Sequence, residues 1–176
     1  FDVMIVNLVQ ASSEPDVTNI CNEAGIPVVY INREPDAERE EAWVTDGIKA
    51  TYVGADARQS GTYQGEEIAE LENKGDADGD GVVRYIMVQG DPENVDAQYR
   101  TEKSIERLSQ DIEVEELTKQ RGDWDQTKGQ EITANALSQY GDKIDVVFCN
   151  NDAMALGALQ AIEAAGRTVN KDIYLV

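Results

Sequence analysis

A short acidic segment carries three aspartates at alternate positions, and this spacing points to metal chemistry. The three residues are Asp76, Asp78 and Asp80. Gly81 follows and can take a sharp turn, and Val82 offers a backbone carbonyl. Hard oxygen ligands in this register can surround one Ca²⁺, as in the first half of an EF-hand loop. The segment therefore predicts a calcium site, while a solvated acidic turn stays open as the simpler alternative.

The residues after this acidic loop depart from the EF-hand pattern. Met87 stands where a bidentate glutamate would complete the ligand shell, and 82–88 is rich in β-branched and aromatic residues. This composition predicts a strand, rather than a helix, after the loop. A cation at the loop therefore needs one more carboxylate from a distant part of the chain.

Charge and composition argue against several classes of function. The chain has 176 residues, with 15 Lys and Arg, 35 Asp and Glu, no histidine and a formal net charge of -20. Such a surface repels nucleic acid and anionic membranes. The missing histidine removes the commonest general base and the commonest transition-metal ligand. Cys21 and Cys149 lie in apolar stretches, which predicts buried thiols and leaves a disulfide open.

Strand-like and helix-like segments alternate along the chain, which predicts an α/β fold, a parallel-sheet sandwich with helices on both faces. The predicted strands are 1–8, 26–31, 50–54, 82–88, 112–118, 145–150 and 172–176. The predicted helices are 12–24, 56–73, 96–108, 127–140 and 153–165, and 38–43 is either a short helix or an irregular excursion.

One natural break divides these elements, between Gly54 and Asp56. We therefore expect two similar lobes, with 1–55 as the remainder of the first and 56–176 as most of the second. Both ends of the chain stop within strand-like patterns, which indicates a fragment of a longer chain. Gly61 and Gly65 share a face of the predicted helix that opens the second lobe, and their small size predicts close packing against another helix.

Polar side chains follow the predicted strands at their carboxyl ends, where open parallel sheets bind ligands. They are Asn7, Asn32, Arg33, Asn94, Asp96, Arg100, Asp123, Trp124, Asn150, Asn151 and Asp152. Amides and carboxylates bond paired hydroxyls, and an indole covers the apolar face of a sugar ring, so the set indicates a neutral polyol as ligand. No glycine-rich phosphate motif opens a helix, which argues against a phosphate ligand.

Each candidate also has a purely structural explanation. Asp96 and Arg100 are four residues apart on a predicted helix and can form a surface ion pair. Trp124 can be a core aromatic residue. Asn151 can be a turn residue or a helix cap, and its neighbour Asn150 competes with it for the ligand role. Asn7 can simply end its strand.

Several of these residues stand in motifs that occur in the same order in a known family. The motifs are Asn-Leu-Val at 7–9, Asn-Arg-Glu-Pro at 32–35, Tyr-Val-Gly at 52–54, Trp-Asp at 124–125 and Asn-Asn-Asp-Ala-Met-Ala at 150–155. From 7 to 176 the chain resembles the periplasmic galactose/glucose-binding proteins of sugar ABC transport. The resemblance implies the type I periplasmic-binding-protein fold, with one partial lobe and most of a second.

For the metal, the resemblance implies one Ca²⁺ held by a nine-residue loop and a distant acid. The matching positions are Asp76, Asp78, Asp80, the Val82 carbonyl and Asp145. Two residues differ from the family, since Asp145 replaces a glutamate and Arg84 replaces a glutamine ligand. Because an arginine cannot coordinate a cation, we expect weaker calcium binding than in the family.

For the ligand, the resemblance implies sugar contacts from several of the candidate residues. They are Asn7, Asp96, Arg100, Trp124 and Asn151, with Asn94 where the family has a histidine. Other contact residues of the family fall outside this chain, so we expect weak or absent sugar affinity.

The implied function is capture of a hexose, galactose or glucose, in the periplasm or outside the cell. The full-length protein, free or anchored as a lipoprotein, would deliver the sugar to a membrane ABC transporter permease without enzymatic chemistry.

Two other functions stay open from the sequence. The effector-binding domain of a lactose-repressor-type regulator shares the implied fold, although the acidic charge argues against it. An α/β enzyme is disfavoured because no histidine, activated nucleophile or phosphate loop accompanies the carboxylates. Unpaired strand edges also predict that the chain associates with copies of itself.

Overall fold

A computed structural model describes all 176 residues, which form two compact units. The first unit comprises Phe1–Asp56 and Glu93–Gln98, and the second comprises Ala57–Pro92 and Tyr99–Val176. The passage after Asp56 lies close to the break that the sequence indicates. The grouping of Glu93–Gln98 with the first unit was not expected. No helix combines the length and the apolar character needed to span a lipid bilayer.

The first unit is a three-stranded parallel sheet in the order β1-β2-β3. Its elements are β1 (Met4–Val6), a 3-10 turn (Ala11–Ser13), α1 (Glu14–Glu23), β2 (Val28–Ile31), α2 (Ala37–Thr45) and β3 (Ala50–Val53). The open segment 38–43 therefore belongs to a helix, α2.

Both helices of the first unit pack on one face of its sheet. Cys21 of α1 and Trp43 of α2 share a buried cluster with Val28 and Tyr30 of β2, and the Tyr30 and Trp43 rings stack with centroids 5.4 Å apart. Strand residues that alternate with Val28 and Tyr30 point to the other face of the sheet. On that face Ile5 and Val53 are 64% and 60% exposed. Helices on both faces, as the sequence predicts, are therefore not found in this unit.

Glu14 is a fully buried carboxylate that ties the two helices of the first unit together. One oxygen accepts hydrogen bonds from the Thr18 hydroxyl at 2.5 Å and the Trp43 indole N–H at 2.8 Å, and the other accepts from Arg39 Nε at 2.6 Å. Burial alone would raise the pKa of Glu14, but hydrogen bonds from Arg39, Thr18 and Trp43 together outweigh it and hold the pKa below its usual value.

We predict that Glu14→Gln lowers the free energy of unfolding by about 1.5–3 kcal/mol, because each charge-assisted hydrogen bond is weakened or lost. Since the folded pKa is depressed, this stability is present above about pH 4.3 and is lost as the pH falls through the folded pKa. Urea unfolding followed by Trp43 fluorescence, in a Trp124→Phe background, measures both effects. Glu23→Gln, at an exposed position of α1, is the control. Equal losses for the two variants would contradict the prediction.

The second unit is a four-stranded parallel sheet in the order β5-β4-β6-β7. Its elements are α3 (Ala57–Ala69), β4 (Val82–Gln89), α4 (Val95–Leu108), β5 (Glu113–Arg121), α5 (Gln126–Tyr140), a 3-10 turn (Gly141–Lys143), β6 (Val146–Cys149), α6 (Asp152–Ala164) and β7 (Tyr174–Leu175). The start of α4, up to Gln98, groups with the first unit. The predicted order of strands and helices is confirmed, although β5 extends to Arg121, beyond the predicted end at 118.

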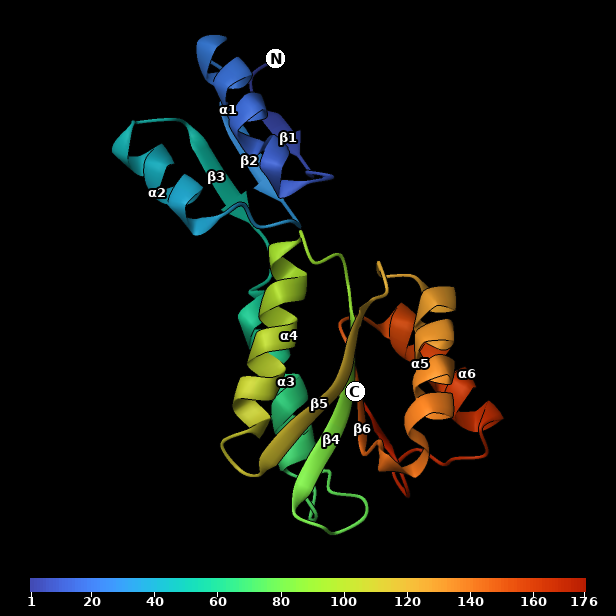
Figure 1. Cartoon of the computed structure of the whole chain (residues 1–176). Helices are drawn as coiled ribbons and strands as arrows, with labels where there is room; N and C mark the ends of the chain where they lie inside the picture. The colour runs from blue at the N-terminus through green and yellow to red at the C-terminus, as the bar shows by residue number, and fades with distance from the viewer. The chain divides into compact units, whose positions relative to one another are not determined.

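Alternate residues of β4 face two separate cores, one on each side of this sheet. Val83, Tyr85 and Met87 join a cluster with residues of α3 and α4. Ile86 and Val88 join a cluster with residues of α5 and α6. Figure 1 shows these two helix pairs on opposite sides of the sheet. Helices on both faces are therefore confirmed for the second unit, and they explain why β4 and β6 are so apolar.

The close packing predicted at Gly61 and Gly65 is confirmed. A Cβ at Gly61 would lie 2.8 Å from the carbonyl oxygen of Arg100, and one at Gly65 would lie 2.2 Å from that of Ser104. The main chains of α3 and α4 therefore touch directly. Both cysteines are free and buried, as the sequence predicts.

Candidate functional site

The second unit has a cavity at the carboxyl end of β6, the end at which open parallel sheets bind ligands. Its volume is about 320 Å³, within the range of small-molecule pockets, about 300–1,000 Å³. Its polar lining residues are Ser60, Gln64 and Glu67 of α3, Arg100 of α4, and Asn150, Asn151 and Asp152 after β6. The lining combines donors with acceptors, which suits a neutral ligand with several hydroxyl groups.

Arg100 is the residue of this cavity with a buried side-chain donor that has no hydrogen-bond partner. Its Nη1 donates to the backbone carbonyl of Asn150 at 2.7 Å, whereas its Nε is buried without a hydrogen-bond partner. An unsatisfied buried donor costs about 1–3 kcal/mol. A ligand oxygen at Nε would recover this energy.

The two consecutive asparagines after β6 have different tasks. Asn150 is buried, and its Oδ1 accepts from the Gly90 backbone N–H at 2.9 Å, which joins the ends of β6 and β4. Asn151 is the N-cap of α6, since its Oδ1 accepts from the Met154 N–H at 3.0 Å. The helix-cap explanation for Asn151 is thus confirmed. Its Nδ2 donates to the Trp124 carbonyl at 3.3 Å, so it also fixes the tryptophan loop.

Trp124 follows β5 in a turn with unusual backbone geometry. Asp123 and Trp124 both have left-handed conformations, with φ values of 51° and 64°. The indole packs directly on Gly90, where a Cβ would lie 2.4 Å from the ring. It is partly buried against the core, and its ring centroid lies 5.9 Å from the Arg100 guanidinium carbon. Trp124 thus serves as a packing residue and borders the Arg100 side of the site.

The Asp123 carboxylate stabilises this turn from outside. It pairs with both Lys128 and Arg121, and these cations hold the pKa of Asp123 below its usual value. Two left-handed residues without glycine cost about 1–2 kcal/mol each. Backbone conformations of this kind cluster at functional sites.

We predict that Asp123→Ala lowers the free energy of unfolding by about 1 kcal/mol more than Asp123→Gly, because glycine adopts the left-handed conformation without steric cost. Urea unfolding followed by Trp124 fluorescence in a Trp43→Phe background measures the difference. Asp142→Ala, at an exposed position with a right-handed backbone, controls for the loss of a surface carboxylate. Equal effects of alanine and glycine at 123 would show that the turn is not left-handed in solution.

The structure brings together three of the predicted sugar-contact residues, Arg100, Trp124 and Asn151, all in the second unit. Asn7 lies in the first unit, after β1. There its Oδ1 accepts a long hydrogen bond of 3.5 Å from Asn32 Nδ2.

Asn94 and Asp96 belong to the segment that groups with the first unit. Asn94 is buried, and its Oδ1 accepts from the Asp96 backbone N–H at 3.0 Å at the start of α4. The Oδ1 atom of Asn94 therefore caps α4, and the sugar contact that the resemblance implies for this residue stays a prediction.

The α3 wall of the cavity was missed by sequence reasoning. Ser60, Gln64 and Glu67 are spaced four and three apart, which places them on one helical face. Gln64 Nε2 donates to the Cys149 carbonyl at 2.7 Å, which ties α3 to the end of β6. The spacing of these polar residues, next to Gly61 and Gly65, could have predicted that α3 presents a polar face near another helix.

At the opposite end of the sheet, the acidic loop makes an ordered array of carboxylates. Asp76 is buried, and its two oxygens accept from the backbone N–H groups of Gly79 and Gly81 at 2.8 and 2.9 Å. Asp78 and Asp80 each accept from the N–H group two residues further on, at 3.1 and 3.0 Å. One oxygen from each of the three aspartates lies within 4.8 Å of the others.

Asp145, the distant acid, lies against this loop from the start of β6. It is 1% exposed, and its oxygens accept from the Ala77 and Arg84 N–H groups at 3.1 and 2.7 Å. Burial raises the pKa of Asp145 above its usual value, and the nearby Asp78 and Asp76 carboxylates raise it further, against the lowering effect of the two amides.

The donor set fits a calcium ion only in part. Oxygens around one Ca²⁺ lie at most about 5 Å apart, so the 4.8 Å separation is compatible with three ligands. Arg84 opposes the fit, because its Nη1 lies 2.8 Å from Asp80 Oδ2 and 4.0 Å from Asp78 Oδ2. Calcium at this loop therefore stays a prediction.

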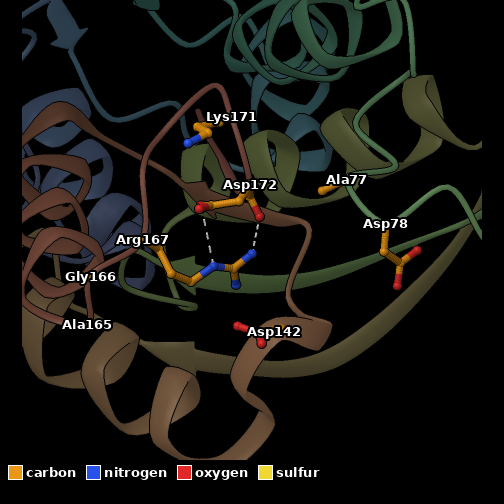
Figure 2. Close-up of a pocket in the computed structure, with 8 residues that line it drawn as sticks. All are labelled: Ala77, Asp78, Asp142, Ala165, Gly166, Arg167, Lys171 and Asp172. Carbon is orange, nitrogen blue, oxygen red and sulfur yellow. Dashed lines mark hydrogen bonds and ion pairs between the residues drawn. The ribbon is translucent and has the colours of Figure 1, made fainter.

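A second cavity, of about 450 Å³, lies beside the acidic loop. Figure 2 shows Arg167 reaching Asp172 across this cavity, with Asp78 standing apart from the pair. Arg167 Nη1 also donates to the Ile144 carbonyl at 2.9 Å. Its guanidinium is thus used to hold the chain, and the cavity lies at the amino end of the sheet. The cavity at Arg100 is therefore the candidate ligand site.

The chain is similar in sequence to periplasmic binding proteins. A family model described as periplasmic binding protein domain matches residues 1–176. The chain is 33% identical over 169 residues to the D-galactose/methyl-galactoside binding periplasmic protein MglB of Haemophilus influenzae, covering 93% of this chain and 50% of that protein. It is 34% identical over 174 residues to a putative rhizopine-binding protein of Rhizobium meliloti, covering 96% and 51%.

Solved structures agree with these relatives. An ABC transporter solute binding protein from Bacillus halodurans with bound myo-inositol superimposes with a TM-score of 0.81 at 31% identity, covering 99% of this chain and 54% of that one. The chain spans about half the length of the curated relatives it matches.

Proposed function

The chain belongs to the periplasmic binding protein domain family, and from this membership we propose that it is part of an extracytoplasmic protein that captures a hexose for an ABC transporter. Galactose and glucose are the proposed ligands, since one relative is named for D-galactose. Delivery of the sugar to a membrane permease completes the proposal. Such a protein binds and releases its ligand without covalent chemistry.

One observation carries the proposal, namely the buried and unpaired Nε–H of Arg100, a residue that lines a polar cavity. A sugar hydroxyl can accept this hydrogen bond, and it needs no opposite charge to do so. The amides and hydroxyls around Arg100 add further donors and acceptors at the same end of the sheet. An anionic ligand would be less suited, because the whole chain carries a net charge of -20.

The other functions have less support. The relatives reported above give no support to an effector domain of a transcription regulator. They are binding proteins rather than enzymes. Within the cavity, Cys149 is the one thiol, and burial raises its pKa strongly, which makes it a poor nucleophile.

A nuclear magnetic resonance titration tests the assignment directly. The Nε–H of an arginine gives its own signal, so the proton of Arg100 can be followed while galactose, glucose, ribose or myo-inositol is added. We predict that a hexose shifts the Arg100 Nε–H and Trp124 indole signals in a saturable way. The dissociation constant should be millimolar, because the chain spans about half the length of the relatives that it matches.

Two variants make the titration specific. Arg100→Lys keeps the positive charge but removes Nε, and should abolish the saturable shift of the Trp124 signal. Arg107 lies further along α4 and pairs with Asp111. Arg107→Lys should therefore leave the titration unchanged. If no sugar alters the Arg100 Nε–H signal, or if Arg100→Lys binds normally, the cavity is not the sugar site.

A further inference from the structure

Most carboxylate oxygens of the acidic loop accept hydrogen bonds from the chain itself. Both oxygens of Asp76 and both oxygens of Asp145 accept backbone N–H groups. Asp78 and Asp80 each use one oxygen, Oδ1, in the same way. The Oδ2 atoms of Asp78 and Asp80 remain, and they are the two oxygens that face Arg84.

Arg84 is held in this position by the sheet. It lies on β4 directly opposite Glu115 of β5 in the parallel register. Its Nε lies 3.1 Å from Glu115 Oε2, while Nη1 reaches Asp80 at 2.8 Å. One guanidinium thus bridges the loop and the neighbouring strand, and its planar shape allows both contacts at once.

The charges around the loop explain why a cation is needed there. Four carboxylates, from Asp76, Asp78, Asp80 and Asp145, converge within one turn of chain and the adjoining strand. Like charges at this spacing repel one another. A calcium ion would relieve the repulsion, and so does a guanidinium that is permanently charged.

We propose that Arg84 is the resident cation of the acidic loop and that it competes with calcium for the Oδ2 atoms of Asp78 and Asp80. The loop is therefore ordered without metal, and calcium binds only by displacing the guanidinium. This inference concerns the end of the sheet opposite the cavity, so it does not rest on sugar binding.

The test compares calcium affinity and thermal stability in the whole chain and its variants. Arg84→Met removes the charge without adding a ligand, and Arg84→Gln removes the charge and adds an amide oxygen. Arg107→Met removes an arginine that pairs with a single carboxylate of the same unit, that of Asp111, and serves as the control. Calorimetric titration with CaCl₂ gives the affinity, and melting in EGTA or in CaCl₂ gives the stability.

We expect the unaltered chain and Arg107→Met to melt at nearly the same temperature in EGTA as in CaCl₂. Arg84→Met should melt at a lower temperature in EGTA and recover in CaCl₂, with a calcium affinity roughly tenfold or more above that of the unaltered chain. Arg84→Gln should show the same pattern with a larger recovery.

Three outcomes would overturn the inference. Equal calcium affinity in the unaltered chain and Arg84→Met would show that the guanidinium does not compete. A gain confined to Arg84→Gln would show that a missing ligand, rather than a competing charge, limits calcium binding. No calcium binding by any variant would leave nothing for Arg84 to compete with. None of these results bears on the sugar titration, so the two proposals fail separately.

Discussion

The buried carboxylate of Asp145 is the constraint on which the second unit depends. It stands at the entrance of β6, and its two oxygens accept N–H groups from either side of the acidic loop, at Ala77 and Arg84. These bonds fix where β4 begins relative to β6, and the strands then pair in parallel from Tyr85 and Val146 onward. A buried charge is tolerated because both oxygens are satisfied. The same bonds hold the loop that gathers the remaining aspartates.

The two ends of the second unit's sheet carry different polar groups. The amino end collects carboxylates, and two arginines there, Arg84 and Arg167, bind acceptors of the chain itself. At the carboxyl end one buried donor, Arg100 Nε, has no hydrogen-bond partner. Rigid packing of β4 and β6 between two cores connects the ends. A ligand therefore meets a preformed wall, which reduces the ordering cost of binding.

The elements of the fold that depend on local residue patterns were predicted correctly from the sequence. Apolar runs located the strands of both units, and polar residues after them led to Arg100, Trp124 and Asn151. Local pattern did not predict contacts between distant segments, and the position of Asp145 beside the acidic loop was expected only from the family resemblance. Nothing local reveals that Glu93–Gln98 groups with the first unit. The capping of α4 by Asn94 Oδ1 was missed although it is a local contact, two residues along the chain. The left-handed turn at Asp123 was also hidden, because no glycine marks it and ion pairs with Arg121 and Lys128 stabilise it instead.

The contact between α3 and α4 has a consequence for how the cavity can change over evolutionary time. At Gly61 and Gly65 the spacing of the two helices is set by main chain against main chain, so substitutions elsewhere in the surrounding core have little influence on it. Gln64 on one helix and Arg100 on the other therefore keep a constant separation across the pocket wall. Changes of ligand preference along the lineage are then expected through exchange of those side chains, while the frame that carries them stays the same size.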